Sequence, residues 1–332
     1  MQPATTTRRT LLSSLLGLAI APALAPALAL ALAPALAADA RPDVAVFIAR
    51  LDTVGARVTE VLNITPVKGA NSQPSFTRDG QAVLFASNRS GSNNVYRHEL
   101  TSGVTTALTS VPHNLYSPTP LPDGSGFSAI RVVDADPNYG IERTEPSLWR
   151  FGWDGKAIAP VVPVMRVGYH AWVDRERLAL FIVDDVADRN AHRAVLFNRT
   201  TGKSTPLTDK PGRSFGRTAD GKRALFVDQA DAEHWRLCAQ GEGDAAPQVL
   251  VETPIGPGGV NDPNRSQYFA ALPDGSVLMA HGALLLRWNG KAGSRFEPLA
   301  ELPGVNGNIR NITASPDGTR LAFSVTLAAP KP

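Results

Sequence analysis

A short turn motif recurs along the chain and constrains its fold more than any other feature. Asp79-Gly80 precedes an apolar stretch at residues 82–86, and similar pairs precede similar stretches. The further copies are Asp123-Gly124, Asp220-Gly221, Asp274-Gly275, Asp317-Gly318 and a degenerate copy at residues 172–176. Their spacing of roughly 43 to 54 residues is typical of a four-stranded propeller blade. Asp-Gly also suits a two-residue hairpin turn, because Gly adopts positive φ without strain.

A second turn lies inside each repeat. Residues 96–100 lead into Thr101-Ser102-Gly103, and comparable stretches lead into Gly155, Gly202 and Gly290. Each repeat therefore reads as strand A, Asp-Gly turn, strand B, loop, strand C, Gly turn and strand D. The sixth repeat stops after strand B, whereas residues 44–51 and 57–62 resemble an isolated C–D hairpin. We predict an all-β, six-bladed β-propeller whose last blade is closed by this N-terminal hairpin.

The repeats also resemble a known family. Residues 74–103 run Pro-x-Phe-x-x-Asp-Gly, strand, then Ser87-Asn88-Arg89-Ser90-Gly91 and Val95-Tyr96. This pattern is similar to the TolB-like propellers, and the resemblance covers residues 44–327. It implies the propeller fold and says little about function. The family's namesake resembles a two-domain protein with an α/β domain before the propeller, and we expect no such domain here, because the export signal and the repeats leave no room for it.

The first 37 residues have the pattern of an export signal. Arg8 and Arg9 precede a Leu- and Ala-rich stretch that ends in Ala35-Leu36-Ala37. We predict a cleaved signal of the twin-arginine type at 1–37, the propeller at 38–332 and a periplasmic location without stable membrane insertion. Without these two arginines, 31 of the 33 basic residues remain against 30 acidic ones, which is a net charge of +1. That charge does not favour a nucleic-acid partner.

Candidate binding residues lie six to eight positions before each Asp-Gly turn. Innermost strands line the channel of a propeller, so these positions should form a polar ring at one mouth. The candidates are Gln73, Tyr116, Tyr169, His170, Arg213, Gln267, Arg310 and Asn311. Guanidinium groups favour a carboxylate or phosphate, so the expected partner of this monomer is a small anionic ligand or a peptide. A simply hydrated channel is the alternative.

Catalysis and metal binding have weaker support in the sequence. A hydrolase or lyase with His170 and Tyr169 as general acid and base is the rival to a binding or scaffold role. Residues 134–145 offer Asp134, Asp136 and Asn138 as calcium ligands, but Tyr139 stands where such a loop needs Gly, which favours an ordinary surface loop. Residues 212–216 spell Gly-x-Ser-x-Gly on an expected strand, where a nucleophile elbow does not fit. We expect no cofactor, and the lone Cys238 should be buried and inert.

Overall fold

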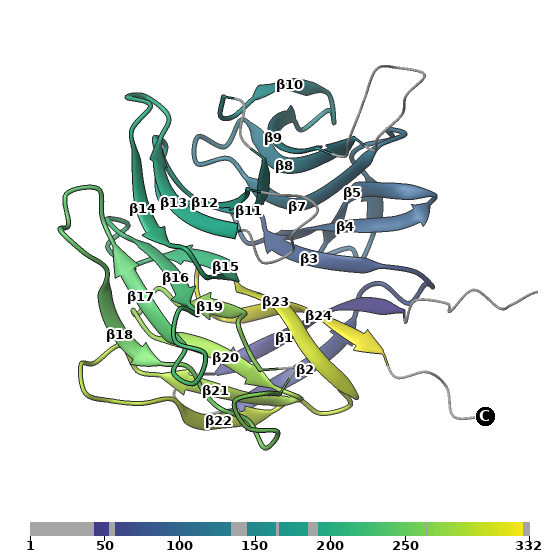
Figure 1. Cartoon of the computed structure of the whole chain (residues 1–332). Helices are drawn as coiled ribbons and strands as arrows, with labels where there is room; N and C mark the ends of the chain where they lie inside the picture. The colour runs from purple at the N-terminus through teal and green to yellow at the C-terminus, as the bar shows by residue number, and fades with distance from the viewer. Residues whose placement is uncertain are drawn as a thin grey trace, which may run out of the picture. The chain divides into compact units, whose positions relative to one another are not determined.

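The chain folds into six four-stranded antiparallel sheets that surround a central channel as the blades of a propeller (Figure 1). The structure is a computed structural model, which describes residues 43–52, 57–133, 145–163, 166–184, 192–262 and 265–327. All regular secondary structure in these ranges is β-strand. None of the described residues belongs to a helix that is long and apolar enough to span a bilayer. The predicted six-bladed all-β propeller is therefore confirmed.

The blades are numbered along the chain, and each runs from its inner to its outer strand. Blade 1 contains β3 (Asn71–Phe76), β4 (Ala82–Ser90), β5 (Ser92–Glu99) and β6 (Thr105–Ala107). Blade 2 contains β7 (Asn114–Pro120), β8 (Gly126–Val133), β9 (Glu145–Gly152) and β10 (Ala157–Pro160). Blade 3 contains β11 (Val167–Trp172), β12 (Arg177–Val183), β13 (His192–Asn198) and β14 (Ser204–Thr208).

The remaining three blades follow the same order. Blade 4 contains β15 (Pro211–Arg217), β16 (Ala224–Asp228), β17 (Arg236–Gln240) and β18 (Gln248–Glu252). Blade 5 contains β19 (Phe269–Ala271), β20 (Val277–His281), β21 (Leu284–Trp288) and β22 (Glu297–Glu301). Blade 6 contains β23 (Gly307–Ala314) and β24 (Arg320–Leu327), followed outward by β1 (Val44–Asp52) and β2 (Arg57–Asn63).

Blade 6 thus combines strands from both ends of the described chain. β1 lies antiparallel to β24, with Val44 opposite Thr326 and Arg50 opposite Arg320. The other edge of β24 pairs with β23, so both edges of β24 are paired, and β2 pairs with the outer edge of β1. Backbone N–H and C=O groups that an unpaired β24 edge would expose are therefore used within the sheet.

The Asp-Gly turns differ from the expected two-residue hairpin. In blade 1 the Gly80 N–H donates to the Thr77 carbonyl. The Thr77 N–H donates to the Ala82 carbonyl, and this hydrogen bond closes the loop between β3 and β4. Of the Asp-Gly pair, only Gly80 has positive φ, at 68°. The loop is therefore a four-residue turn that ends in a left-handed Gly, and Asp79 instead caps it by accepting a hydrogen bond from the Gln81 N–H.

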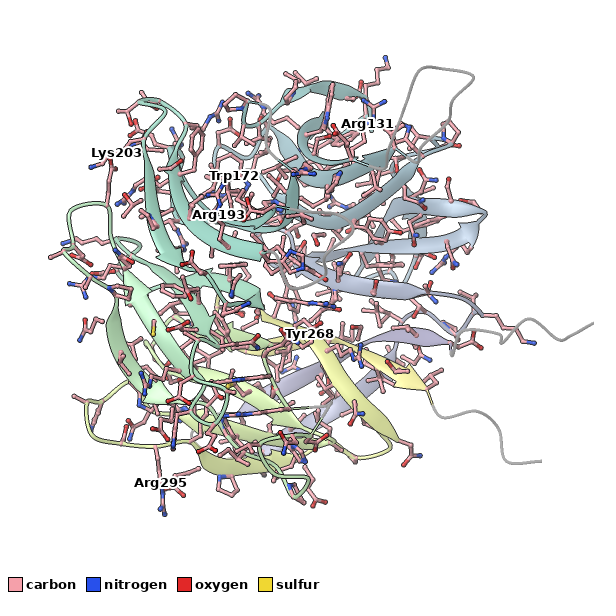
Figure 2. All side chains as sticks on the ribbon, viewed as in Figure 1. Arg131, Trp172, Arg193, Lys203, Tyr268 and Arg295 are labelled. Atoms are coloured by element: carbon pink, nitrogen blue, oxygen red, sulfur yellow. The ribbon has the colours of Figure 1, made fainter. Side chains whose placement is uncertain are left out.

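Charged side chains at the margin of the ring are paired with one another. Lys203 lies 3.9 Å from Glu242, and Arg295 lies 2.7 Å from Glu297. Both cations are far from the centre in Figure 2, whereas Tyr268 lies near it. Polar groups near the channel are therefore not part of this outer set of ion pairs.

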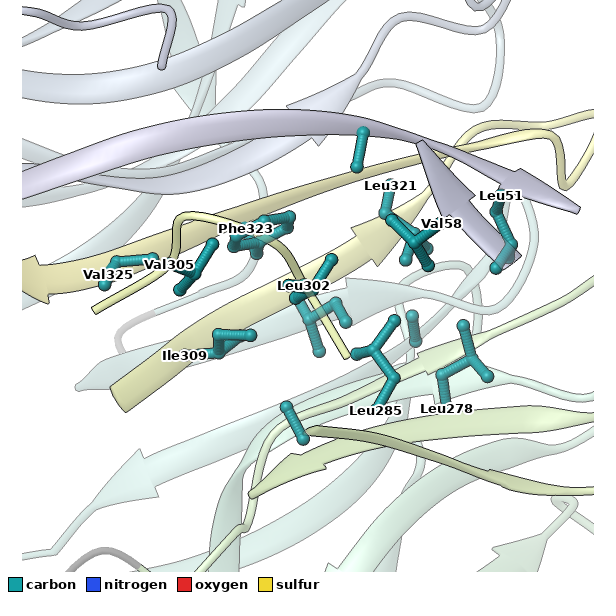
Figure 3. Packing of buried hydrophobic residues seen from close by; sticks show 14 of the residues in the cluster. Leu51, Val58, Leu278, Leu285, Leu302, Val305, Ile309, Leu321, Phe323 and Val325 are labelled. Atoms are coloured by element: carbon teal, nitrogen blue, oxygen red, sulfur yellow. The ribbon is translucent and has the colours of Figure 1, made fainter. Parts of the chain in front are cut away.

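Apolar residues pack between the blades rather than in one central core. Six clusters of buried side chains each join two neighbouring blades, including blades 6 and 1. Figure 3 shows the cluster between blades 5 and 6, where Leu278 and Leu285 meet Ile309, Leu321 and Phe323. This arrangement explains why the second strand of each blade is apolar on both faces: it lies between two neighbours.

Candidate functional site

A cavity of about 490 Å³ runs along the innermost strands and takes its lining from every blade. The lining segments are residues 73–76, 117–120, 169–172, 213–219, 268–273 and 311–316. Arg213 and Arg217 are the only Lys, Arg, Asp or Glu residues among them. A volume of this size suits a small molecule or a short extended peptide.

Five of the eight predicted binding residues line the cavity: Gln73, Tyr169, His170, Arg213 and Asn311. Tyr116, Gln267 and Arg310 are not in its wall, where their successors Ser117, Tyr268 and Asn311 stand instead. Tyr116 is engaged elsewhere, since its hydroxyl accepts a hydrogen bond from Asn93 Nδ2 at 3.0 Å. Successive residues of a strand point in opposite directions, and the turn spacing alone does not reveal which one faces the channel.

The cavity wall has two chemically different halves. We call the part from blades 6, 1 and 2 the amide half, after Asn311, Gln73 and Ser117. The part from blades 3, 4 and 5 is the tyrosine half, which presents Tyr169, Arg213 and Tyr268. Two residues further along the strands, the amide half has the hydroxyl residues Thr313, Ser75 and Thr119. Two residues after Tyr169, Arg213 and Tyr268, the tyrosine half has Ala171, Phe215 and Ala270.

The amide half is built on left-handed backbone. Gln73, Ser117 and Asn311 have φ values of 56°, 49° and 48°, a conformation that non-glycine residues rarely adopt. Each lies where one extra residue interrupts the pairing of its inner strand, which forms a β-bulge. Such a bulge commonly carries Gly at its left-handed position. Gln73, Ser117 and Asn311 therefore carry side chains at positions where the backbone of Gly would be less strained. Strained backbone of this kind is commonly found at binding sites.

Hydrogen bonds hold the amide half in place. Gln73 Oε1 accepts the backbone N–H of Ser117 at 2.9 Å, which links blade 1 to blade 2. Because that N–H can only donate, the amide of Gln73 must turn its oxygen toward Ser117 and leave its NH₂ group free to donate. Asn311 is held by Ser324, whose hydroxyl lies 3.0 Å from Asn311 Oδ1. The fixed orientation of Gln73 makes it a hydrogen-bond donor toward the channel.

Positive charge gathers around Tyr268 in the tyrosine half. Burial raises the pKa of Tyr268 above its usual value, Tyr169 acts in the same direction, and Arg213 and Arg310 oppose them. The Arg213 side chain also donates a hydrogen bond to the Tyr268 hydroxyl. Arg310, although outside the cavity wall, therefore acts on the same group as Arg213. Neither arginine forms an ion pair with a carboxylate in the described part of the chain.

His170 faces the boundary between blades 2 and 3. Its Nε2 lies 2.7 Å from Ser128 Oγ, which also accepts the Trp172 indole N–H at 2.9 Å and lies 3.2 Å from the Thr119 carbonyl. All four groups have a partner if His170 donates through Nε2 and Ser128 donates to Thr119. Nδ1 is then an unprotonated acceptor, and it has no partner among the described residues. Burial lowers the pKa of His170 to about 3, so this ring is neutral near pH 7.

The other sequence candidates do not add to the site. Gly212–Gly216 lies within β15, which continues through a turn into β16, so Ser214 is not at a strand-to-helix elbow. Asp134, Asp136 and Asn138 lie outside the described residues. Among the residues that are described, no group of three or more His, Cys, Asp or Glu side chains could hold a metal ion. Cys238 is buried in β17, and burial raises the pKa of its thiol to about 12.

Arg217 is the main residue of the cavity that the sequence did not reveal, whereas Ser117 lies within the candidate window beside Tyr116. Arg217 lies three positions before Asp220, closer to the turn than the candidate positions, and yet it reaches the wall. A search for charged residues over the full length of each inner strand would have found it. Ser117 attracts no attention as a residue type, and its left-handed backbone is visible only in the structure.

Solved structures with this fold include proteins of several kinds. A protein assigned as TolB from Agrobacterium tumefaciens has a TM-score of 0.62 and 13% identity, covering 86% of this chain and 99% of its own. A gluconolactonase from Xanthomonas campestris has a TM-score of 0.55 and 11% identity, covering 87% and 96%. An oligogalacturonate lyase in complex with manganese has a TM-score of 0.52 and 12% identity, covering 81% and 80%.

These similarities concern the fold. No protein-family model and no curated protein sequence matches the chain. The predicted resemblance to TolB-like propellers is confirmed at the level of architecture. Since a lyase and a lactonase share that architecture, the fold does not choose between binding and catalysis.

Proposed function

We propose that this chain is an exported, periplasmic binding or scaffold propeller that holds a small oxyanion, or an anionic group of a peptide, at the channel. The observation that carries the proposal is the arginine cluster around Tyr268. Arg213 and Arg310 are cations without a carboxylate partner among the described residues, and the cavity lining contains no acidic side chain. A site with cationic and neutral donors and no carboxylate favours an anion.

The amide half supports the same class of ligand. The Gln73 carbonyl is occupied by Ser117, so its NH₂ group is the part left for a ligand. This group adds a donor across the ring from Arg213, because blades 1 and 4 lie opposite each other in a six-bladed ring. Oxyanions accept hydrogen bonds from both kinds of donor.

A channel hydrolase or lyase is the second candidate, and the unpartnered Nδ1 of His170 is the observation in its favour. The protonation state of His170 argues against this enzymatic role. A pKa of about 3 leaves too little of the protonated ring near pH 7 for a general acid, and it makes a weak general base. His170 is also only 8% exposed. We therefore assign His170 to the support of the wall, and the periplasmic location rests on the signal pattern at 1–37.

Titration of the purified protein with small anions tests the binding function. Acetate, inorganic phosphate and N-acetyl-dialanine would be added at low salt to the wild type, Arg213→Ala and Arg310→Ala, with Arg295→Ala as the control. We expect binding of at least one probe and a weakening of roughly ten- to a hundredfold in each of the two variants at Arg213 and Arg310, because the positive charge around Tyr268 is reduced. Arg295→Ala should bind as the wild type does, since Arg295 lies at the margin and pairs with Glu297.

Two outcomes would contradict the proposal. One is an affinity that neither Arg213→Ala nor Arg310→Ala changes, because these two arginines would then not act on the bound anion. The other is turnover of an ester, lactone or polyuronate that His170→Ala abolishes, which would establish the enzyme instead.

A further inference from the structure

A second guanidinium without a carboxylate partner among the described residues lines the same cavity, four residues further along β15. Arg217 is exposed and stands beside the Asp220-Gly221 turn, where a Cβ on Gly221 would lie 3.8 Å from Arg217 Nη1. Its Nη1 donates a hydrogen bond to the Val173 carbonyl of blade 3, at 3.2 Å. No carboxylate in the described ranges pairs with it. By contrast Arg177, also beside a blade turn, is neutralised by Asp174 at 2.5 Å.

Arg213 and Arg217 occur four residues apart on β15, and both line the cavity. An extended strand advances about 3.3 Å per residue, so their Cα atoms are at most roughly 13 Å apart. Two extra residues in the pairing between Pro211 and Phe215 shorten this distance. Arg213 and Arg217 therefore stand at two different levels of the cavity wall, with a Cα separation that a small elongated molecule can span.

The wall between the two arginines is neutral. In the tyrosine half it includes Ala171, Phe215, Gly216 and Ala270, together with Ser214, whose hydroxyl contacts the Phe269 backbone at 3.3 Å. This stretch is largely apolar and carries no charge, so it suits a chain of carbon atoms better than a second ionic group. The amide half faces it with hydroxyl groups, two of which bond to backbone carbonyls, Ser75 to Pro118 and Thr119 to Ser117.

We propose that the ligand carries two oxyanion groups, one at each end of an elongated, uncharged middle. This inference rests on the proposed function, since it extends the anion site at Arg213 to a second anion site at Arg217. One anionic group binds at Arg213 beside Tyr268, and the other binds at Arg217 near the Asp220-Gly221 turn. Carboxylates and phosphates share this chemistry.

Linear dianions of graded length test the inference. Succinate, adipate, suberate and sebacate would be titrated against the wild-type protein at low salt, each beside its monomethyl ester. Alkane bisphosphonates and their monophosphonates form a second arm, which distinguishes carboxylate from phosphate recognition. We expect one length to bind best, at least tenfold more tightly than its monoanion, because only that length reaches both guanidinium groups.

The variant Arg217→Gln removes the charge and keeps a donor for the Val173 carbonyl. We expect it to bring the ratio of dianion to monoanion affinity close to one while the monoanion affinity stays unchanged. Arg213→Ala should weaken both kinds of ligand, and Arg295→Gln should weaken neither. An unchanged monoanion affinity also shows that Arg217→Gln is folded.

The failures of the two proposals are distinguishable. If dianions bind no more tightly than monoanions, or if Arg217→Gln leaves their ratio intact, the second anion site is excluded and the first remains. If none of these anions binds to the wild type, both proposals are wrong.

Discussion

The two halves of the cavity wall occupy equivalent positions of one repeat, and yet they differ in backbone and in chemistry. In the amide half, Gln73, Ser117 and Asn311 adopt left-handed φ at a bulge. In the tyrosine half, Tyr169 and Tyr268 stand at the same distance from their turns without positive φ. The repeat therefore determines where the wall lies, whereas each blade determines what the wall presents.

The difference also separates two ways of preparing a site. In the amide half, strained backbone and the bond from Ser117 to Gln73 hold a neutral donor in position. The tyrosine half relies on partial burial of Tyr268 beside two arginines. Restrained donors lose little entropy when a ligand binds, and unpaired guanidinium groups supply the attraction. The two halves meet between blades 2 and 3, where Ser128 joins His170 and Trp172.

The largest expected effect is on acid stability at this boundary. His170 has a pKa of about 3 in the folded state, well below its unfolded value, so the unfolded chain binds the proton more readily. Its contribution to stability is therefore complete above about pH 6.5 and is lost as the pH falls toward 3. Urea unfolding between pH 6.5 and 4.0 should show His170→Gln losing about 3 kcal/mol less than the wild type.

Comparing two proteins that differ only at His170 cancels the contributions of His98 and His113, whose pKa values burial also lowers. Equal loss of stability in both proteins over this range would show that His170 is not held neutral. The boundary between blades 2 and 3 would then be more open to water than the 8% exposure of His170 indicates.

A smaller effect is expected from Ser128→Ala. The substitution leaves the Trp172 indole N–H and the His170 Nε2–H without their acceptor in a fully buried place. We expect a loss of about 2 kcal/mol in the free energy of unfolding. The matched control is Ser147→Ala, which removes the acceptor of the Trp149 indole at 3.0 Å.

Ser147 is partly exposed, so water can replace its hydroxyl. The control should therefore lose less than about 1 kcal/mol. If the two variants lost the same stability, the Ser128 contacts would not be the special support of the boundary between the halves.

The smallest effect separates the halves by backbone alone. Ser117→Gly should raise the free energy of unfolding by about 0.5 kcal/mol, because Gly adopts φ near 49° without the strain that serine carries. In the tyrosine half Ser214→Gly should lower the free energy of unfolding, because Ser214 has no positive φ and its hydroxyl contacts the Phe269 backbone at 3.3 Å. Denaturant unfolding would measure both, and a destabilised Ser117→Gly would mean that no strain is stored there.

The sequence reveals the fold more fully than the site. Repeated Asp-Gly turns before apolar strands are enough to predict six blades, because every blade must bury both faces of its second strand. They do not predict the inner register. One extra residue at 73–74, 117–118 and 311–312 breaks the two-residue alternation, so Ser117 rather than Tyr116 reaches the cavity.

His170 shows a second limit of the sequence. Its place on an inner strand is visible from the repeat, but its neighbour Ser128 lies 42 residues away in the chain, on the adjacent blade. Contacts between blades decide whether such a ring is a charged ligand-binding group or a neutral structural one. A pattern within one repeat does not contain that information.

The pairing of β1 with β24 has a consequence for how the protein is made. During synthesis β1 emerges first and must wait, unpaired on one edge, until residues 320–327 leave the ribosome. A nascent chain therefore exposes an unpaired edge of β1 for most of its translation. A premature stop codon anywhere before Arg320 would leave that edge unpaired in the product, which would then be prone to aggregation.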